Sequence, residues 1–326
     1  MLKTFSVLQL IFFSVFINCA QAQEADYSLY HKQIMNAEIL IGSENFNGAL
    51  KVYNEVFSDF DFVFLRDCKI ASQLALYKGE VGLAFQYLRR AVSSGWDMKQ
   101  IKKNDYLKKM QKLPDWQDFE KEYPKLHADY ESSLNSELRS RVQKMFSKDQ
   151  KKALGALFTI GSKGQDKYAE KKFAPHSEEQ MKELIEILSD FGYPGEKLIG
   201  NDFWVSTTLS HHNSISQDYA RKDTIYLYLK PELRKALIRG EVSPFELALI
   251  DEWQRSTLAQ GSYEGYGILD PPTKSTLQNT NDLRSEQFLR SVETRNALVD
   301  IQDKTQMDFY LPGEGWIRGK IEVVPN

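Results

Sequence analysis

Two segments in the N-terminal half of the chain repeat one pattern of small and apolar positions. The corresponding positions of ENFNGALKVYNEV and KGEVGLAFQYLRRAV are Ala49, Tyr53 and Val56, then Ala84, Leu88 and Ala91. The spacing of four and then three residues places each set on one face of an α-helix. The offset of 35 residues between Ala49 and Ala84 therefore indicates two copies of one helical unit.

A further helix is expected before each of these two, over residues 30–41 and 65–78. Helix pairs that recur at about 34 residues are typical of tetratricopeptide repeats, and this part of the chain resembles that family. Small residues at Ala37 and Ser72 match positions where paired helices approach closely, although the usual tryptophan of the first helix is missing. The resemblance implies a short stack of helical hairpins.

Trp96 and Trp116 lie in the segment that follows the second unit. Gly95 ends the preceding helix, and apolar residues then recur through residues 96–119. Such an element caps the exposed face of a last repeat, which makes both tryptophans core residues. Ligand platforms are the alternative interpretation of these two side chains.

The remaining chain is also patterned as helices. An amphipathic stripe predicts a helix over 126–158, and its positions are Leu134, Leu138, Val142 and Met145. Gly192 is expected to end a later helix, and Pro194 with Gly195 to form the turn that follows.

Three helix starts are expected from side chains that can accept a hydrogen bond from the first turn. These are Ser177, then Asn201 or Asp202, and then Ser243, which precedes a proline. Pro231 is expected to kink or divide the helical region over 216–239.

We therefore predict a mainly α protein. Tetratricopeptide-like hairpins are followed by an all-helical C-terminal domain with a short irregular or β tail, since residues 320–323 alternate as in an edge strand. The predicted segments are a signal peptide (1–22), the repeat domain (26–122), a connecting helix and loop (123–176) and a helical domain with its tail (177–326).

The first 22 residues have the pattern of a secretory signal peptide. Lys3 is followed by an apolar run over 7–17 and by Ala20-Gln21-Ala22, a small-x-small cleavage site. The run is too short for the roughly 30 Å of a bilayer core, so we expect no membrane span after cleavage. Cys19 raises the option of a lipoprotein, but Asn18 before it is a poor match. The protein is thus expected to be exported, to the periplasm or the medium.

Cleavage there changes the charge and the thiol content of the chain. Without Lys3 and Cys19 it carries 41 basic and 45 acidic residues, a net of −4, and Cys68 is its one remaining cysteine. No intramolecular disulfide can then form. The mild negative charge argues against nucleic acid as a partner, and a protein or a cell-envelope component is the partner we expect.

The sequence suggests neither a cofactor nor a metal. Gly161–Gly164 lacks the spacing of a phosphate loop, and no GxSxG, HExxH or CxxC motif occurs. The adjacent His211 and His212 point about 100° apart on a helix, so they do not suit one metal ion.

An ordered set of residues in the C-terminal half resembles a family of uncharacterised bacterial domains over about residues 134–300. The matching positions are Tyr193, Pro194, Gly195, Gly200, His212, Asp251, Tyr266 and Gly267. The resemblance brings no known activity. The chain departs from the pattern at Asn213, where an aspartate is expected nearby, and at Glu252, where an arginine is expected.

Two functions follow from these residues as hypotheses. The first is an exported helical module that binds its partner without catalysis. The second is a hydrolase in which His212 acts as general base or lone metal ligand and Asp251 orients it, with Tyr266 also in the site. Candidate binding residues are Tyr193, Trp204, His211 and Glu264. A purely structural role is the third alternative.

Overall fold

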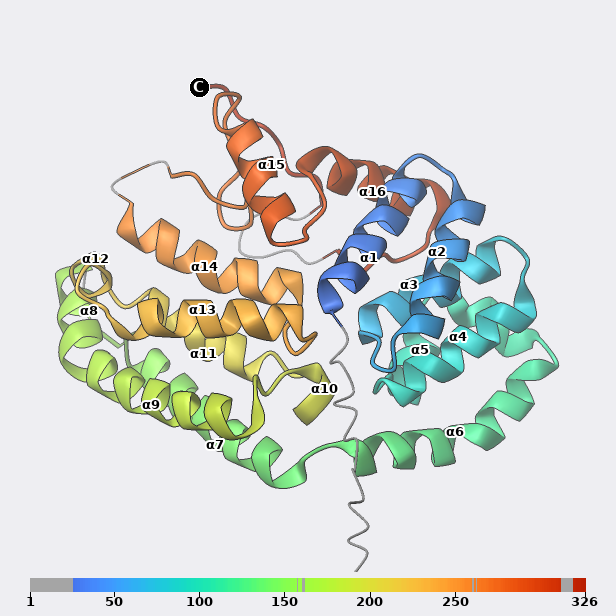
Figure 1. Ribbon diagram of the computed structural model, residues 1–326, viewed down its shortest axis with the longest axis horizontal. Helices are drawn as coiled ribbons and strands as arrows, with labels where there is room; N and C mark the ends of the chain where they lie inside the picture. Colours follow the sequence, from blue (N-terminus) through green and yellow to red (C-terminus); the bar gives the residue numbers. More distant parts are fainter. Residues whose placement is uncertain (1–25, 157, 160–161, 260, 262, 312–318) are drawn as a thin grey trace, which may run out of the picture.

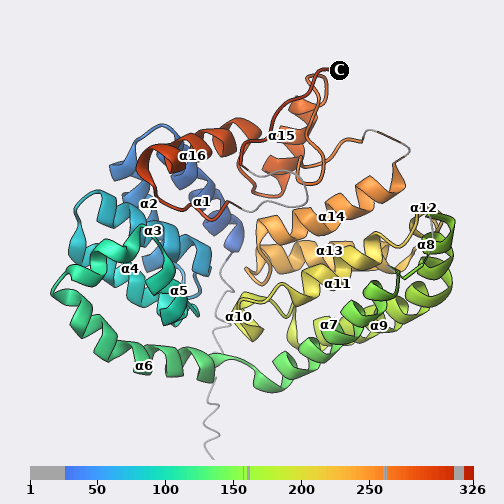
Figure 2. The ribbon, with the colours of Figure 1, turned by 180° about the vertical axis from the view of Figure 1, so that it is seen from behind.

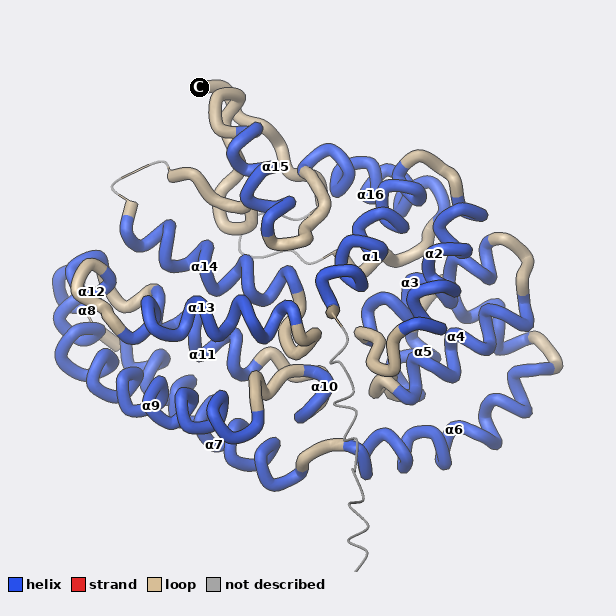
Figure 3. The backbone as a smooth tube through the Cα atoms, in the orientation of Figure 1, coloured by secondary structure: helices blue, strands red, loops and turns tan. Residues whose placement is uncertain are grey.

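The computed structural model describes residues 26–326 except 157, 160–161, 260, 262 and 312–318. The predicted signal peptide, residues 1–22 with Cys19, lies outside the described residues. In the described part all regular elements are helices and none is a strand (Figure 3), which confirms the mainly α class. Residues 320–323 form no strand, and Thr273 and Val324 share an isolated parallel bridge. No described helix is both long and apolar enough to cross a bilayer.

The first group of helices covers the N-terminal half. It comprises α1 (Tyr27–Gly42), α2 (Phe46–Asp59), α3 (Leu65–Tyr77), α4 (Val81–Ser93), α5 (Met98–Lys103), the 3₁₀-helix η1 (Leu107–Lys112) and α6 (Asp115–Ser133). The predicted helices over 30–41 and 65–78 are α1 and α3, and the two repeated segments are α2 and α4.

The second group begins with α7. It comprises α7 (Ser136–Ala156), α8 (Ser162–Tyr168), the π-helix η2 (Ala169–Phe173), α9 (Ala174–Phe191), α10 (Glu196–Ile199), α11 (Trp204–Asn213), α12 (Gln217–Ala220), α13 (Ile225–Ile238), α14 (Pro244–Leu258), α15 (Leu277–Glu286) and α16 (Val292–Thr305).

The helices form two halves that lie side by side (Figure 1). Helices α1–α5 make one half and α7–α14 the other, and α6 runs along the lower edge from the first half toward the second. The view from behind shows the same division (Figure 2). After α14 the chain returns through α15 to α16, which packs against α1.

The first hydrophobic core lies between the helices of the N-terminal half. Trp96 and Trp116 are buried in it, as expected of core residues, and so is the free thiol of Cys68. Residues from the end of the chain complete this core, namely Leu298, Ile301, Met307 and Phe309. The tail that we grouped with residues 177–326 therefore packs with the other half.

The second core lies between α7, α9, α11, α13 and α14. The predicted stripe of α7 supplies Leu138, Val142 and Met145 to this core. The helix predicted over 126–158 is divided at residues 134–135, because Leu134 is extended and Asn135 caps α7. The Oδ1 atom of Asn135 accepts the N–H of Leu138 at 3.0 Å.

The structure confirms one of the three helix starts predicted from the sequence and differs at the other two. Ser243 is the expected N-cap of α14, and the structure adds a capping box with Glu246. Ser177 is not a cap, because α9 begins at Ala174 as a continuation of η2. Asn201 and Asp202 do not cap α11 either, since this helix begins after Phe203 without a side-chain cap.

Pro231 neither divides nor ends its helix and lies inside α13. The break in the predicted region over 216–239 lies earlier, between α12 and α13. Its physical cause is Asp223, whose carboxylate accepts the N–H groups of Ile225 (2.8 Å) and Tyr226 (3.2 Å) and so starts a new helix.

Candidate functional site

A cleft of about 840 Å³ lies between the two halves. Helices α1 and α3 form one wall, α10, α11 and α14 form the other, and parts of α6 and residues 288–290 also line it. The cleft includes five partly or largely exposed aromatic rings, those of Tyr130, Phe203, Phe245, Phe288 and Tyr310. Phe203 is 63% exposed. Small-molecule sites typically have about 300–1,000 Å³ and mainly apolar walls, so the cleft has the size and lining of a ligand site.

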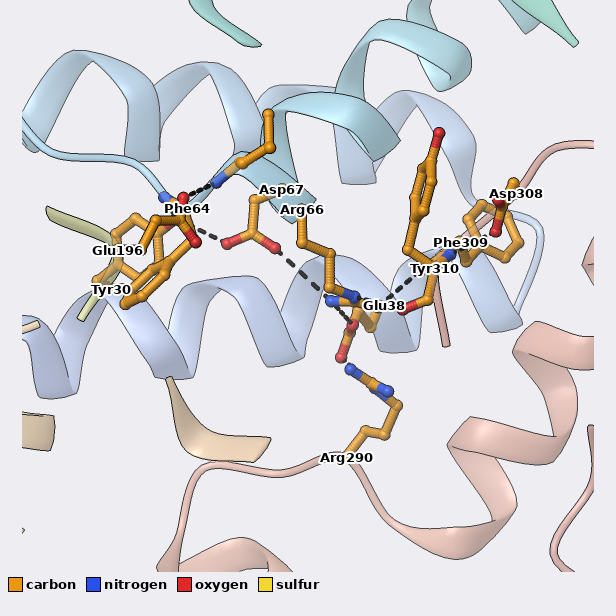
Figure 4. A network of polar contacts seen from close by, with 11 residues as sticks. Tyr30, Glu38, Phe64, Arg66, Asp67, Glu196, Arg290, Asp308, Phe309 and Tyr310 are labelled. Carbon is orange, nitrogen blue, oxygen red and sulfur yellow. Dashed lines mark hydrogen bonds and ion pairs between the residues drawn. The ribbon is translucent and has the colours of Figure 1, made fainter. Parts of the chain in front are cut away.

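One wall of the cleft contains a buried ion network (Figure 4). The carboxylate of Glu38 accepts from Nη1 of Arg66 at 2.8 Å and from Nε of Arg290 at 2.6 Å. Arg66 also donates to the main-chain oxygens of Phe309 and Tyr310, at 3.0 and 3.2 Å. The network thus joins α1, α3 and the two segments that flank α16, which fixes the shape of this wall.

Asp67 and Tyr30 extend the network (Figure 4). The Tyr30 hydroxyl donates to Oδ2 of Asp67 at 2.6 Å and accepts the N–H of Phe64 at 3.1 Å. Burial raises the pKa of Asp67 to about 6, although Arg66 and the Tyr30 hydroxyl oppose the shift. Asp67 is therefore a carboxyl group that titrates near neutral pH in the cleft wall.

The turn after α9 places Glu196 in the cleft. Gly192 has a φ of +82°, which favours glycine. A Cβ atom on Gly195 would lie 2.1 Å from the carbonyl oxygen of Glu241, so no side chain fits there. Helix α10 starts directly behind this turn, and Oε1 of Glu196 accepts the N–H of Leu65 at 2.5 Å (Figure 4). This bond crosses from the second half to the first turn of α3.

Burial disfavours the charged form of two carboxyl groups of the cleft, those of Glu196 and Glu246. Burial raises the pKa of Glu196 to about 8, and the nearby Glu246 and Asp67 raise it further against the effect of the Leu65 N–H. Burial also raises the pKa of Glu246. Neither Glu196 nor Glu246 was among the site residues predicted from the sequence, and Glu196 had little to mark it. Its one local signal was its position directly behind Pro194-Gly195.

His212 lies outside this cleft and has two polar partners. Its Nδ1 lies 2.9 Å from Oγ of Ser177, and its Nε2 lies 3.2 Å from Oδ2 of Asp223. Both ring nitrogens are thus used, and Asp251 is not the residue that orients the ring. Serine, histidine and aspartate are the residue types of a hydrolase triad, but Ser177 is fully buried. Asp223 reaches a hollow of about 440 Å³ that neither Ser177 nor His212 lines.

Asp251 and Tyr266 contact each other, whereas the hydrolase hypothesis needs Asp251 within hydrogen-bond reach of His212. The Tyr266 hydroxyl donates to Oδ2 of Asp251 at 3.0 Å, and Nε of Arg255 donates to the same oxygen at 2.8 Å. Lys230 and Tyr226 donate to Oδ1. Burial opposes ionisation, yet Lys230 and Arg255 hold the pKa of Asp251 below its usual value. A carboxylate with four donors is a structural anchor and a poor base.

Glu252 explains why an arginine does not follow Asp251. Its carboxylate is buried and accepts the main-chain N–H groups of Tyr266 (2.5 Å), Ile268 (3.1 Å) and Leu269 (3.4 Å). An acceptor is needed at this position to satisfy three donors of the loop after α14. An arginine side chain carries donors alone and could not replace it.

The four predicted binding residues lie apart from one another in the described contacts. The Trp204 ring stacks on Phe146, His211 Nδ1 lies 2.6 Å from Asp149, and Glu264 accepts from Asn279 at 2.9 Å. Tyr193 is buried in the second core. None of these four residues lines the cleft described above. They are packing and surface residues around the second core.

His31 connects the two halves at the edge of the cleft. Its Nε2 lies 3.1 Å from the carbonyl oxygen of Leu237 in α13, and its ring stacks on Phe288 with 5.6 Å between centroids. Burial lowers the pKa of His31 to about 4, against the smaller opposite effect of the Leu237 carbonyl. The folded protein therefore holds this histidine neutral.

This gives a prediction for the pH dependence of stability. The unfolded chain binds a proton at His31 below about pH 6.5, whereas the folded protein does so below about pH 4. The contribution of neutral His31 to the free energy of unfolding is thus complete above pH 6.5 and is lost as the pH falls toward 4. The loss is at most about 1.4 kcal/mol per pH unit and about 3 kcal/mol in total. Urea unfolding of the wild type and of His31→Gln between pH 7 and pH 4.5 measures it. Equal pH slopes for the two proteins would contradict the prediction.

No family model matches the chain, and neither a curated protein nor a solved structure matches it. The cleft and its residues are therefore the observations that bear on function.

Proposed function

We propose that the protein is a binding module and that its ligand occupies the cleft between the two halves. The observation that carries this proposal is the cleft itself, about 840 Å³ with aromatic rings that include the largely exposed Phe203. Exposed aromatic surface inside a concave site is the usual means of binding a ligand by its apolar parts. A cleft of this size takes a small envelope component or a short segment of a protein.

The alternative of a hydrolase built on His212 and Asp251 has less support. His212 interacts with Ser177 and Asp223 through its two ring nitrogens, and Asp251 already accepts four hydrogen bonds. Ser177, the hydroxyl nearest to the ring, is fully buried. A nucleophile must reach its substrate, so this group suits a packed core better than a reaction site.

The repeat hairpins, the family resemblance, the export and the partner predicted from the sequence are part of the same proposal. We infer that α1–α4 are two hairpins of the tetratricopeptide kind, in line with the packing of α1 on α2 and of α3 on α4. Resemblance to the uncharacterised bacterial domain family, export through the signal peptide, and a partner in the cell envelope complete the proposed identity. Export through the signal peptide predicts that the cleft meets its ligand outside the cytoplasm.

A variant that fills the cleft tests the proposal. Thr207 lines the cleft from α11, so Thr207→Trp places an indole ring in the space of the ligand. Ser58→Trp on the exposed surface of α2 is the matched control. A library of small amines, sugars, carboxylic acids and aromatic alcohols is screened by ligand-observed NMR against the wild type.

We expect compounds that compete with one another for one site on the wild type. Their affinity should fall at least about 10-fold in Thr207→Trp, a loss of about 1.4 kcal/mol or more, and stay unchanged in Ser58→Trp. Absence of any bound compound would contradict the proposal, and so would equal binding to wild type and Thr207→Trp.

A further inference from the structure

The acidic and basic groups around the cleft do not balance. Seven carboxyl groups line it, against four side chains of arginine and lysine. Two groups of ion pairs neutralise part of this charge: Glu38 and Asp67 with Arg66 and Arg290, and Asp202 with Arg139. The lining thus contains more carboxyl groups than its own lysine and arginine side chains pair with in the described part of the chain.

The carboxyl groups left over are those of Asp97, Glu131, Glu196 and Glu246. No ion pair joins them to a lysine or arginine within the described part of the chain. The remaining cation of the lining is Lys69, whose ammonium group lies over the rings of Trp96 and Tyr310, at 5.2 and 4.9 Å from their centroids. Lys69 also acts on Glu196 through its charge but forms no ion pair with it, and no described lysine or arginine of the lining pairs with Glu246.

Aromatic side chains line the same walls of the cleft as these carboxyl groups. Phe203 is 63% exposed, and Phe245 directly precedes Glu246 on α14. Tyr130 lines the cleft from α6. Ring faces attract ammonium and guanidinium groups as well as apolar surface. Acidic groups and rings together complement a molecule that carries positive charge on an apolar body.

We propose that the cleft binds an organic cation with an apolar or aromatic body, and that Glu196 and Glu246 are the carboxylates that receive its positive charge. This inference rests on the proposed function, because it takes the cleft to be the binding site and names the chemistry of its ligand.

The groups around Glu196 determine how a bound cation changes the protonation of its carboxyl group. Charged or titratable groups face it from three elements: Glu246 on α14, Asp67, Cys68 and Lys69 on α3, and Tyr130 on α6. Its pKa of about 8 leaves most of the carboxyl protonated at pH 7. A bound ammonium group favours the carboxylate, so binding at pH 7 releases a proton from Glu196 to the solvent.

Calorimetry with three terminally blocked tetrapeptides tests the proposal. Their sequences are Phe-X-Phe-X with lysine, glutamine or glutamate at X, so that they share the apolar body and differ in charge. We expect the lysine peptide to bind at least about 10-fold more tightly than the glutamine peptide, and the glutamate peptide to bind most weakly. Octylamine against octanol makes the same comparison for a small amine and separates a peptide source from a small-molecule source.

Glu196→Gln should weaken the lysine peptide about 10-fold and leave the glutamine peptide unchanged. Glu55→Gln, which removes the same charge from an exposed position on α2, should change neither. Titrations at pH 7 in two buffers of different ionisation enthalpy should show proton release on binding by the wild type. Glu196→Gln should release less, and the wild type at pH 9.5 should release almost none.

The outcomes separate this inference from the proposed function. Charged and neutral probes that bind equally well, and that no longer bind to Thr207→Trp, would contradict a cationic ligand. The same result would keep the cleft as a binding site. Failure of both cationic probes to bind also overturns the inference, and so does binding that Thr207→Trp does not weaken. Absence of proton release overturns the assignment of Glu196.

Discussion

Replacing Glu38 with glutamine is expected to lower the free energy of unfolding by about 3–5 kcal/mol. Glu38 is 3% exposed and is the shared partner of Arg66 and Arg290, of which Arg290 is 7% exposed. Glutamine keeps the shape of the side chain but removes its charge, so the buried Arg290 and the partly buried Arg66 are left with too little negative charge. Urea unfolding followed by circular dichroism measures the effect.

An exposed ion pair provides the control for this prediction. Lys51 and Glu55 lie 3.8 Å apart on the surface of α2, and Glu55→Gln should cost less than about 1 kcal/mol. The double variant Glu38→Gln with Arg290→Gln should lose less free energy of unfolding than the two single variants lose together, by about 0.5–3 kcal/mol. A loss below about 1 kcal/mol in Glu38→Gln would show that the network does not stabilise the fold.

Replacing Glu252 with alanine should have an effect of similar size for a different reason. This change removes no partner charge, but it leaves the N–H groups of Tyr266, Ile268 and Leu269 without their acceptor. Each unsatisfied buried donor costs about 1–3 kcal/mol, and local relaxation reduces the total to about 3–5 kcal/mol. Hydrogen exchange of these three amides, together with urea unfolding, measures the loss.

Two variants delimit the role of Glu252. Glu252→Gln retains one acceptor oxygen and should lose about half as much stability. Glu264→Ala changes an exposed carboxylate of the same loop and should stay within about 0.5 kcal/mol of the wild type. Unchanged exchange rates for the three amides in Glu252→Ala would contradict the prediction.

The sequence predicts well those elements that local spacing determines. Helices α2 and α4 follow from apolar residues four and three positions apart, and the start of α14 follows from Ser243 and the proline behind it. In both cases the residues that interact lie within one or two helical turns, so the pattern contains the interaction itself.

Ser177 and Glu196 show why the rest did not follow. Ser177 has the side chain of a cap, yet its hydroxyl lies against His212, 35 positions along the chain. Glu196 faces the cleft because it accepts from Leu65, 131 positions away. One sequence contains no sign of these contacts, since they depend on how the two halves meet. The pairing of His212 with Asp251 was the wrong choice among the acidic residues of the second half for the same reason.

The return of the chain end to the first core has a consequence for folding. Leu298, Ile301, Met307 and Phe309 complete a core whose other members lie between residues 27 and 119. This core therefore reaches its final packing only after residues 298–309 have been synthesised. Contacts of such large sequence separation slow folding and prolong the time during which apolar surface is open to aggregation.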